Sequence, residues 1–184
     1  RIKIDVEPEV QPKGAPVMHF QNKMKGGVIP NEFIPAIEAG LREEAKSGGK
    51  TGYPLVDLKV TLVDGDAHDV DSNDMAFRFA ASDALRNAIE EAGPVLLEPI
   101  MRLEVVTPED YLGNITADLA SRRALIERTS TRGKLMVIDA RAPLKEMFGY
   151  STAVRSLSQG RASYTMEPLE YAAAPESMLE ALTG

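Results

Sequence analysis

The most chemically distinctive stretch of this chain is an acidic loop with one imidazole, Asp64-Gly65-Asp66-Ala67-His68-Asp69-Val70-Asp71. Clustered carboxylates suit calcium, and a calcium-binding EF-hand loop needs glycine at its sixth position and glutamate at its twelfth. Counting from Asp64 or from Asp69 puts neither residue at its required position. The loop is therefore more typical of a solvated helix start than of a calcium site.

His68 is the residue of this loop that could move protons. No Ser, Cys or Lys accompanies it in a recognisable nucleophile motif, and catalysis needs such a constellation. The chain has two histidines and no cysteine, which excludes a thiolate metal site, a cysteine nucleophile and a disulfide scaffold. An enzyme that uses the acidic loop with a metal ion remains an alternative, to be tested by metal binding and hydrolase activity.

Two glycine pairs, in Gly26-Gly27 and Ser47-Gly48-Gly49, could suggest phosphate-binding loops. Neither lies in a G-x-x-x-x-G-K-[ST] or a G-x-G-x-x-G motif, so the sequence gives no support for nucleotide binding.

Four arginines of the second half could contact a phosphate backbone: Arg122, Arg123, Arg128 and Arg132. The alternative is that they are solvated charges at a helix end and a hairpin, and spacing alone leaves both open. No aromatic pair lies in the inner strands expected here, so backbone contacts are favoured over base stacking.

The net charge of the 184-residue chain is −7, which argues against a protein that coats nucleic acid. Residues 1–98 hold 11 basic and 17 acidic side chains, whereas residues 99–166 hold 10 basic and 7 acidic ones. No apolar run approaches the roughly 18 residues of a membrane span. The chain does not begin with Met, which indicates a fragment or a processed product.

The first half predicts the order strand, strand, helix, strand, helix. Alternating apolar residues indicate extended segments over 2–6 and 56–62, and Val17, Phe20 and Met24 suggest another over 17–24. Pro35 favours the start of a helix and Gly48 its end. A second helix is expected from a cap at Asp71 or Ser72 to a stop at Gly93.

The second half predicts strand, helix, strand, strand, helix, strand over about 70 residues, the βαββαβ ferredoxin-like pattern. Thr107-Pro108 would cap and begin its first helix, and Arg122 and Arg123 would close that helix at the negative end of the dipole. The second helix is expected from Tyr150 to a stop at Gly160. The sequence therefore predicts an α+β protein of two small domains.

Several long motifs resemble the C-terminal part of bacterial translation elongation factor G, in family order along nearly the whole chain. The first half holds Lys25-Gly26-Gly27-Val28-Ile29-Pro30, Phe33-Ile34-Pro35-Ala36, Gly52-Tyr53-Pro54 and His68-Asp69-Val70-Asp71-Ser72. The second half holds Pro94-Val95-Leu96-Leu97-Glu98-Pro99-Ile100-Met101, Glu146-Met147-Phe148-Gly149-Tyr150 and Gln159-Gly160-Arg161-Ala162-Ser163-Tyr164-Thr165-Met166.

The resemblance implies two domains. Residues 1–98 would be most of domain IV, a ribosomal-protein-like α/β domain with a left-handed crossover, and residues 99–184 would be domain V, a ferredoxin-like βαββαβ domain. Together they would form the ribosome-binding module of a cytoplasmic translational GTPase that promotes tRNA–mRNA translocation during elongation. GTP and Mg would belong to an N-terminal domain of the parent protein, so this fragment is expected to be no enzyme and to hold no cofactor.

The resemblance also implies where this module meets its partners. His68, Asp69 and Val70 would lie at the tip of the domain IV arm, which enters the decoding region beside mRNA and tRNA. Arg122 and Arg123 would lie near a helix of domain V that faces ribosomal RNA and stalk-base proteins. Neither a membrane nor DNA is expected as a partner.

In one respect the chain departs from the family. The family's other tip loop, rich in glycine, lies upstream of the strand expected over 2–6, and the chain starts after it. An unpaired sheet edge would then favour association. A paralogue that acts in ribosome recycling, rescue or antibiotic protection is the alternative function, although the tip motif favours a translocase.

Overall fold

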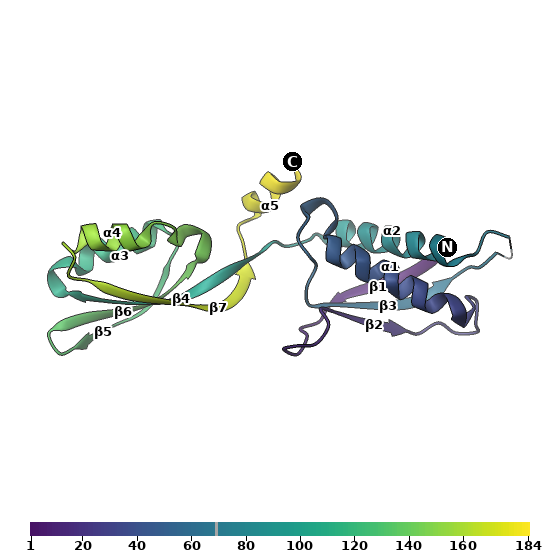
Figure 1. Ribbon diagram of the computed structural model, residues 1–184, viewed down its shortest axis with the longest axis horizontal. Coiled ribbons are helices and arrows are strands. Elements are labelled where there is room, and N and C mark those ends of the chain that lie inside the picture. The colour runs from purple at the N-terminus through teal and green to yellow at the C-terminus, as the bar shows by residue number, and fades with distance from the viewer. Residues whose placement is uncertain (69) are drawn as a thin grey trace. The chain divides into compact units, whose positions relative to one another are not determined.

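The computed structural model describes residues 1–68 and 70–184, and its backbone divides into two units (Figure 1). Arg1–Pro94 and Leu179–Gly184 form the first unit, and Val95–Met178 form the second. Both units combine helices with a sheet, which confirms the prediction of two small α+β domains.

The first unit is a three-stranded sheet packed against two helices. The sheet has the order β1-β3-β2, from β1 (Ile2–Pro8), β2 (Met18–Asn22) and β3 (Leu58–Gly65). β1 runs antiparallel to β3, whereas β2 runs parallel to it. The helices, α1 (Ile34–Ser47) and α2 (Asp74–Ala92), share one core with the sheet, built around the fully buried Ile37, Leu41, Val60, Leu62 and Leu85.

α1 begins and ends where the sequence predicts. Pro35 lies in its first turn, where a missing N–H is not needed. Its C-terminal cap is Gly48, with a φ of 70°. A Cβ at this position would lie 1.8 Å from the carbonyl oxygen of Tyr53. Glycine is therefore required here both for the left-handed backbone and for the close approach of the next segment.

The cap of α2 differs from the prediction of Asp71 or Ser72. Asn73 is the cap, because its Oδ1 accepts a hydrogen bond of 2.8 Å from the N–H of Ala76. The hydroxyl of Ser72 instead accepts a bond of 2.8 Å from the N–H of His68 in the preceding loop.

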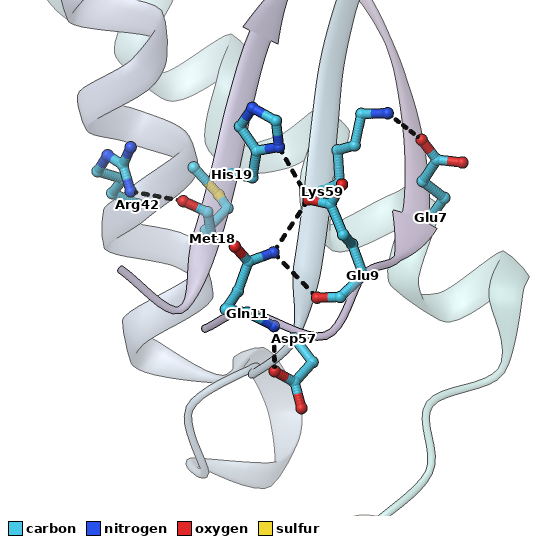
Figure 2. A network of polar contacts seen from close by, with 8 residues as sticks. All are labelled: Glu7, Glu9, Gln11, Met18, His19, Arg42, Asp57 and Lys59. Carbon is cyan, nitrogen blue, oxygen red and sulfur yellow. Dashed lines mark hydrogen bonds and ion pairs between the residues drawn. The ribbon is translucent and has the colours of Figure 1, made fainter. Parts of the chain in front are cut away.

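A polar network centred on Glu9 holds the end of the sheet where β2 begins (Figure 2). The Glu9 carboxylate accepts a 3.1 Å bond from Gln11 Nε2 and lies 2.8 Å from His19 Nδ1. These contacts, Gln11's first, lower the pKa of Glu9. The N–H groups of Glu9 and Gln11 donate to the carbonyl and the Oδ1 of Asp57, at 2.8 and 3.0 Å. Asp57 has a φ of 53°, a conformation that persists where such bonds fix it.

The second unit confirms the predicted βαββαβ order. Its elements are β4 (Leu97–Pro108), α3 (Leu112–Ser121), β5 (Leu125–Arg132), β6 (Leu135–Pro143), α4 (Tyr150–Leu157) and β7 (Ser163–Ala173). All neighbouring strands are antiparallel, in the order β5-β6-β4-β7. α3 and α4 cover one face of this sheet (Figure 1). A further helix that the sequence analysis missed, α5 (Glu176–Thr183), follows β7.

The start of α3 also differs from the prediction. Thr107 was expected to cap it, but Thr107 is the fully buried partner of Met136 in the ladder between β4 and β6. Its hydroxyl donates to the carbonyl of Pro108 instead. The helix begins only at Leu112, after a 3-10 turn over Glu109–Tyr111, because the strand ladder extends to Pro108.

One carboxylate of the first unit is buried between α1 and α2. The Glu44 side chain is 7% exposed. It accepts bonds of 3.0 and 2.9 Å from Nε and Nη2 of Arg86, and one of 2.8 Å from the hydroxyl of Ser82. These bonds, Arg86's first, hold the pKa of Glu44 below its usual value of 4.5. The two helices are therefore joined by a desolvated charge whose partners must stay in place.

We expect Arg86→Ala to lower the free energy of unfolding of the first unit clearly more than its matched control does, because a buried carboxylate loses its counter-charge. Arg78→Ala is the matched control. Arg78 also joins α2 to α1, with bonds of 3.1 and 2.6 Å to Glu43, but both side chains are at least half exposed. Its loss should cost about 1 kcal/mol or less. Native-state hydrogen exchange of the α1 and α2 amides measures the loss of stability in each variant. Equal losses in Arg86→Ala and Arg78→Ala would contradict the role given to Glu44.

The cost of Arg86→Ala should depend on pH. Because the pKa of Glu44 is lower in the folded state, its contribution to stability is complete above the unfolded value near 4.5. It is lost as the pH falls through the lower folded value. Protonation also relieves the unpaired carboxylate of the variant, so the difference between wild type and Arg86→Ala should shrink from pH 7 to pH values below about 4. A constant difference over this range would contradict the assignment.

Candidate functional site

The loop between β3 and α2, residues 66–73, is called the tip loop here. It presents the predicted His68 and Val70 on its surface, with Val70 93% exposed. Asp69, predicted together with them, lies outside the described residues. The loop therefore offers an imidazole ring and an aliphatic group to a partner instead of burying them in the unit.

Hydrogen bonds fix the tip loop on both sides of His68. The N–H of His68 donates to the Ser72 hydroxyl at 2.8 Å, and the N–H of Ser72 donates back to the His68 carbonyl at 3.0 Å. On the other side, the N–H of Asp66 donates to the carbonyl of Arg1 at 2.8 Å. The backbone of His68 is thus positioned before any partner binds.

A second loop, residues 23–33 between β2 and α1, leaves the sheet at the same end as the tip loop (Figure 1). The reason is the parallel pairing of β2 with β3, which places Asn22 beside Leu62. Lys23 and Lys25 of this loop are not among the candidates that the sequence predicts. The sequence shows that these lysines follow an extended segment. It does not show that this segment pairs in parallel with β3, which places the lysines at the same end of the sheet as the tip loop.

In the part of the chain that the structure describes, no three His, Asp or Glu side chains are arranged to hold a metal ion. None of the helices described is long and apolar enough to cross a membrane. At the base of the tip loop, Asp64 accepts a hydrogen bond from the N–H of Gly65 at 2.9 Å. This end of the unit exposes the His68 and Val70 side chains together with charged groups.

Arg122, predicted as a partner contact, is bound within the second unit. Its Nε donates to Asp118 at 3.0 Å, and its Nη1 donates to the carbonyls of Glu146 at 2.7 Å and Phe148 at 3.3 Å. The guanidinium also lies 5.2 Å from the ring centre of Tyr150, and the side chain is 18% exposed. Arg122 therefore links the end of α3 to the segment that precedes α4.

Arg123 follows α3 in a left-handed conformation, with a φ of 59°. Its Nη2 lies 2.5 Å from the carboxylate of Glu98, which is buried, and its Nη1 lies 3.8 Å from Glu146. The bond to Glu98 is the main reason that the pKa of Arg123 is raised. Its side chain is 37% exposed, twice the fraction of Arg122, so it is the more accessible of the two.

Arg128 and Arg132, the other arginines that could have met phosphates, take part in an arginine–carboxylate ladder on the sheet face opposite α3 and α4. Arg128 lies 2.7 Å from Asp139, and Arg132 lies 3.2 Å from Glu104. The ladder is completed by Arg102 with Glu167, and by Arg141 with Glu127 and Glu170. This geometry favours the alternative in which the charges neutralise one another.

Comparison with known proteins gives independent evidence about the family of this chain. The family model for elongation factor G, domain IV, matches residues 1–93, and the model for the elongation factor G C-terminus matches residues 95–182. Elongation factor G of Fervidobacterium nodosum is 57% identical over 161 residues, 88% of this chain and 23% of the relative. Elongation factor G of Thermotoga neapolitana is 53% identical over 179 residues, 97% of this chain and 25% of the relative.

A crystal structure of a protein from Thermus thermophilus superimposes with a TM-score of 0.78 at 37% identity, over 99% of this chain and 27% of that chain. The chain thus spans about a quarter of the length of these relatives. With both units matched in order and curated relatives more than half identical, the chain belongs to the elongation factor G family of translation factors, as its domain IV followed by its C-terminal domain.

Proposed function

We propose that this chain is the ribosome-binding C-terminal module of a translational GTPase and promotes tRNA–mRNA translocation during elongation. The observation that carries the proposal is the tip loop, in which His68 and Val70 are exposed on a backbone fixed at both ends. Its partners would be ribosomal RNA, with mRNA and tRNA in the decoding region, and the proteins of the stalk base. GTP and Mg would bind elsewhere in the full-length factor, which would work in the cytoplasm.

The tip loop suits contact with RNA in a specific way. An imidazole ring can stack on an exposed base or donate a hydrogen bond to ribose or phosphate. Val70 offers an apolar surface beside it, and Asp69 completes the proposed contact. Because Ser72 already holds the His68 backbone, little conformational freedom is lost when the contact forms.

We place a second contact at the C-terminal end of α3, through Arg122 and Arg123, toward ribosomal RNA of the large subunit. Arg123 supports this role by its exposure, although a phosphate would compete with Glu98 for its guanidinium. Arg122 supports it by holding the backbone at Phe148, whose ring is 77% exposed. Arg123 would thus supply the charge at the surface, and Arg122 would hold the backbone beneath it in place.

In the full-length factor, His68→Ala should slow translocation about fivefold or more, because one base or hydrogen-bond contact is worth roughly 1–3 kcal/mol. GTP hydrolysis should be nearly unchanged, since that chemistry belongs to another domain. Pre-steady-state kinetics measures both steps. A factor for recycling, rescue or antibiotic protection would not accelerate translocation even as wild type.

His19→Ala is the matched control, because His19 is the other histidine of the chain and lies in the polar network at the opposite end of the same sheet (Figure 2). It should translocate like wild type. Normal translocation by His68→Ala would contradict the contact. An equal loss of GTP hydrolysis would indicate misfolding or failed ribosome binding.

The double variant Arg122→Ala/Arg123→Ala should flatten the slope of log affinity against log salt for large subunits by about 0.9, as expected for the one phosphate contact of Arg123. Hydrogen exchange at residues 146–150 tells contact from internal support, because only loss of Arg122's carbonyl bonds exposes that backbone. Faster exchange with an unchanged slope would leave these arginines as purely structural.

A further inference from the structure

We infer that Lys23 and Lys25, on the loop that follows β2, bind RNA phosphates beside the tip loop. This inference rests on the proposed function and adds the charge that the tip loop itself lacks. The acidic side chains of that loop repel phosphate, so contact with RNA needs cations nearby. The structure places two lysines on the adjoining loop.

The first step is position. β2 and β3 run parallel, so the segments that follow them leave the sheet at the same edge (Figure 1). The N–H of Lys23 donates to the carbonyl of Leu62 at 2.9 Å, directly before the end of β3 at Gly65. Lys23 therefore starts its loop beside the strand that leads into the tip loop.

The second step is packing between the two loops. Ile29, from the loop of Lys23 and Lys25, is fully buried. A Cβ at Gly65 would lie 2.5 Å from the Cδ1 of Ile29. Glycine at the end of β3 thus lets the second loop pack directly against the strand from which the tip loop starts.

The third step is the state of the charges. Both lysines are exposed, and neither has a carboxylate within ion-pair distance in the ranges 1–68 and 70–184. Two other lysines of the unit are paired: Lys50 lies 2.9 Å from Glu90, and Lys59 lies 2.7 Å from Glu7. An ammonium without an internal partner loses no ion pair when it meets a phosphate, and it acts there as a compact point charge.

The fourth step is access to the backbone. Gly26 and Gly27, which follow Lys25, have φ values of 84° and 63°, and a Cβ at either would meet nothing within 4 Å. Glycines in such an open loop allow a ligand to come close to the main chain. RNA fits this surface better than an acidic protein segment does. It presents bases to His68 and Val70 together with phosphates for the lysines, whereas carboxylates alone would meet the acidic tip loop.

The test compares the 184-residue chain with Lys23→Ala/Lys25→Ala, using small ribosomal subunits that carry mRNA and tRNA as the probe. Two lost phosphate contacts should flatten the slope of log affinity against log salt by about 1.4–1.8 between roughly 50 and 200 mM salt. Lys23→Arg/Lys25→Arg should keep the slope. Thermal unfolding should be unchanged in both variants, because the side chains are exposed.

Lys13→Ala/Lys46→Ala is the matched control, since it removes the same charge from exposed lysines at the opposite end of the unit. Lys13 follows β1, which runs antiparallel to β3, and Lys46 lies in the last turn of α1. Equal slopes for the two double Ala variants would overturn the inference while binding itself persists. If the wild-type chain fails to bind the subunits, the proposed function fails and this inference with it.

The class of partner is tested by a photoreactive side chain in place of Lys25. Cross-links to ribosomal RNA, mRNA or tRNA support the inference. Cross-links confined to ribosomal proteins would overturn it in favour of an acidic protein partner.

Discussion

The parallel pairing of β2 with β3 is the constraint on which the first unit depends. Parallel neighbours cannot be joined by a tight turn, so the chain must cross the unit between them, and it does so as α1. The same pairing brings the ends of both strands to one edge, where residues 23–33 and the tip loop emerge together. The surface proposed for RNA contact is therefore a consequence of strand direction.

Much of the local structure could be predicted from residue patterns. Alternation located β1 and β3, and Pro35 and Gly48 located the ends of α1, because these residues act through their own backbone geometry. The predicted helix caps were wrong where a residue elsewhere in the chain determines the position of the side chain. Thr107 is a good cap by type, but its strand partner in β6 keeps it in the sheet. Ser72 is also a good cap by type, but in the fold its hydroxyl bonds to the N–H of His68 and Asn73 is the cap.

In the candidate site, too, the sequence does not show which distant residues each side chain contacts. The exposure of His68 and Val70 agrees with a loop position, which the sequence could predict. The surroundings of Arg122 could not be predicted, since Glu146 and Phe148 lie more than twenty residues away in sequence. The sequence likewise could not distinguish an ion-paired lysine from Lys23, because pairing depends on which carboxylates the fold brings near. Charge type alone therefore did not identify the cations that are free to bind.

The arginine–carboxylate ladder of the second unit has a consequence for how that sheet assembles. In the register of its two central strands, Arg102 of β4 lies directly opposite Arg141 of β6, and Glu104 lies opposite Asp139. Like charges in such facing positions repel. In the finished sheet these charges are paired with carboxylates of β7 and arginines of β5. The central strands alone would lack these partners, so β5 and β7 contribute to the stability of the inner pair by supplying the opposite charges.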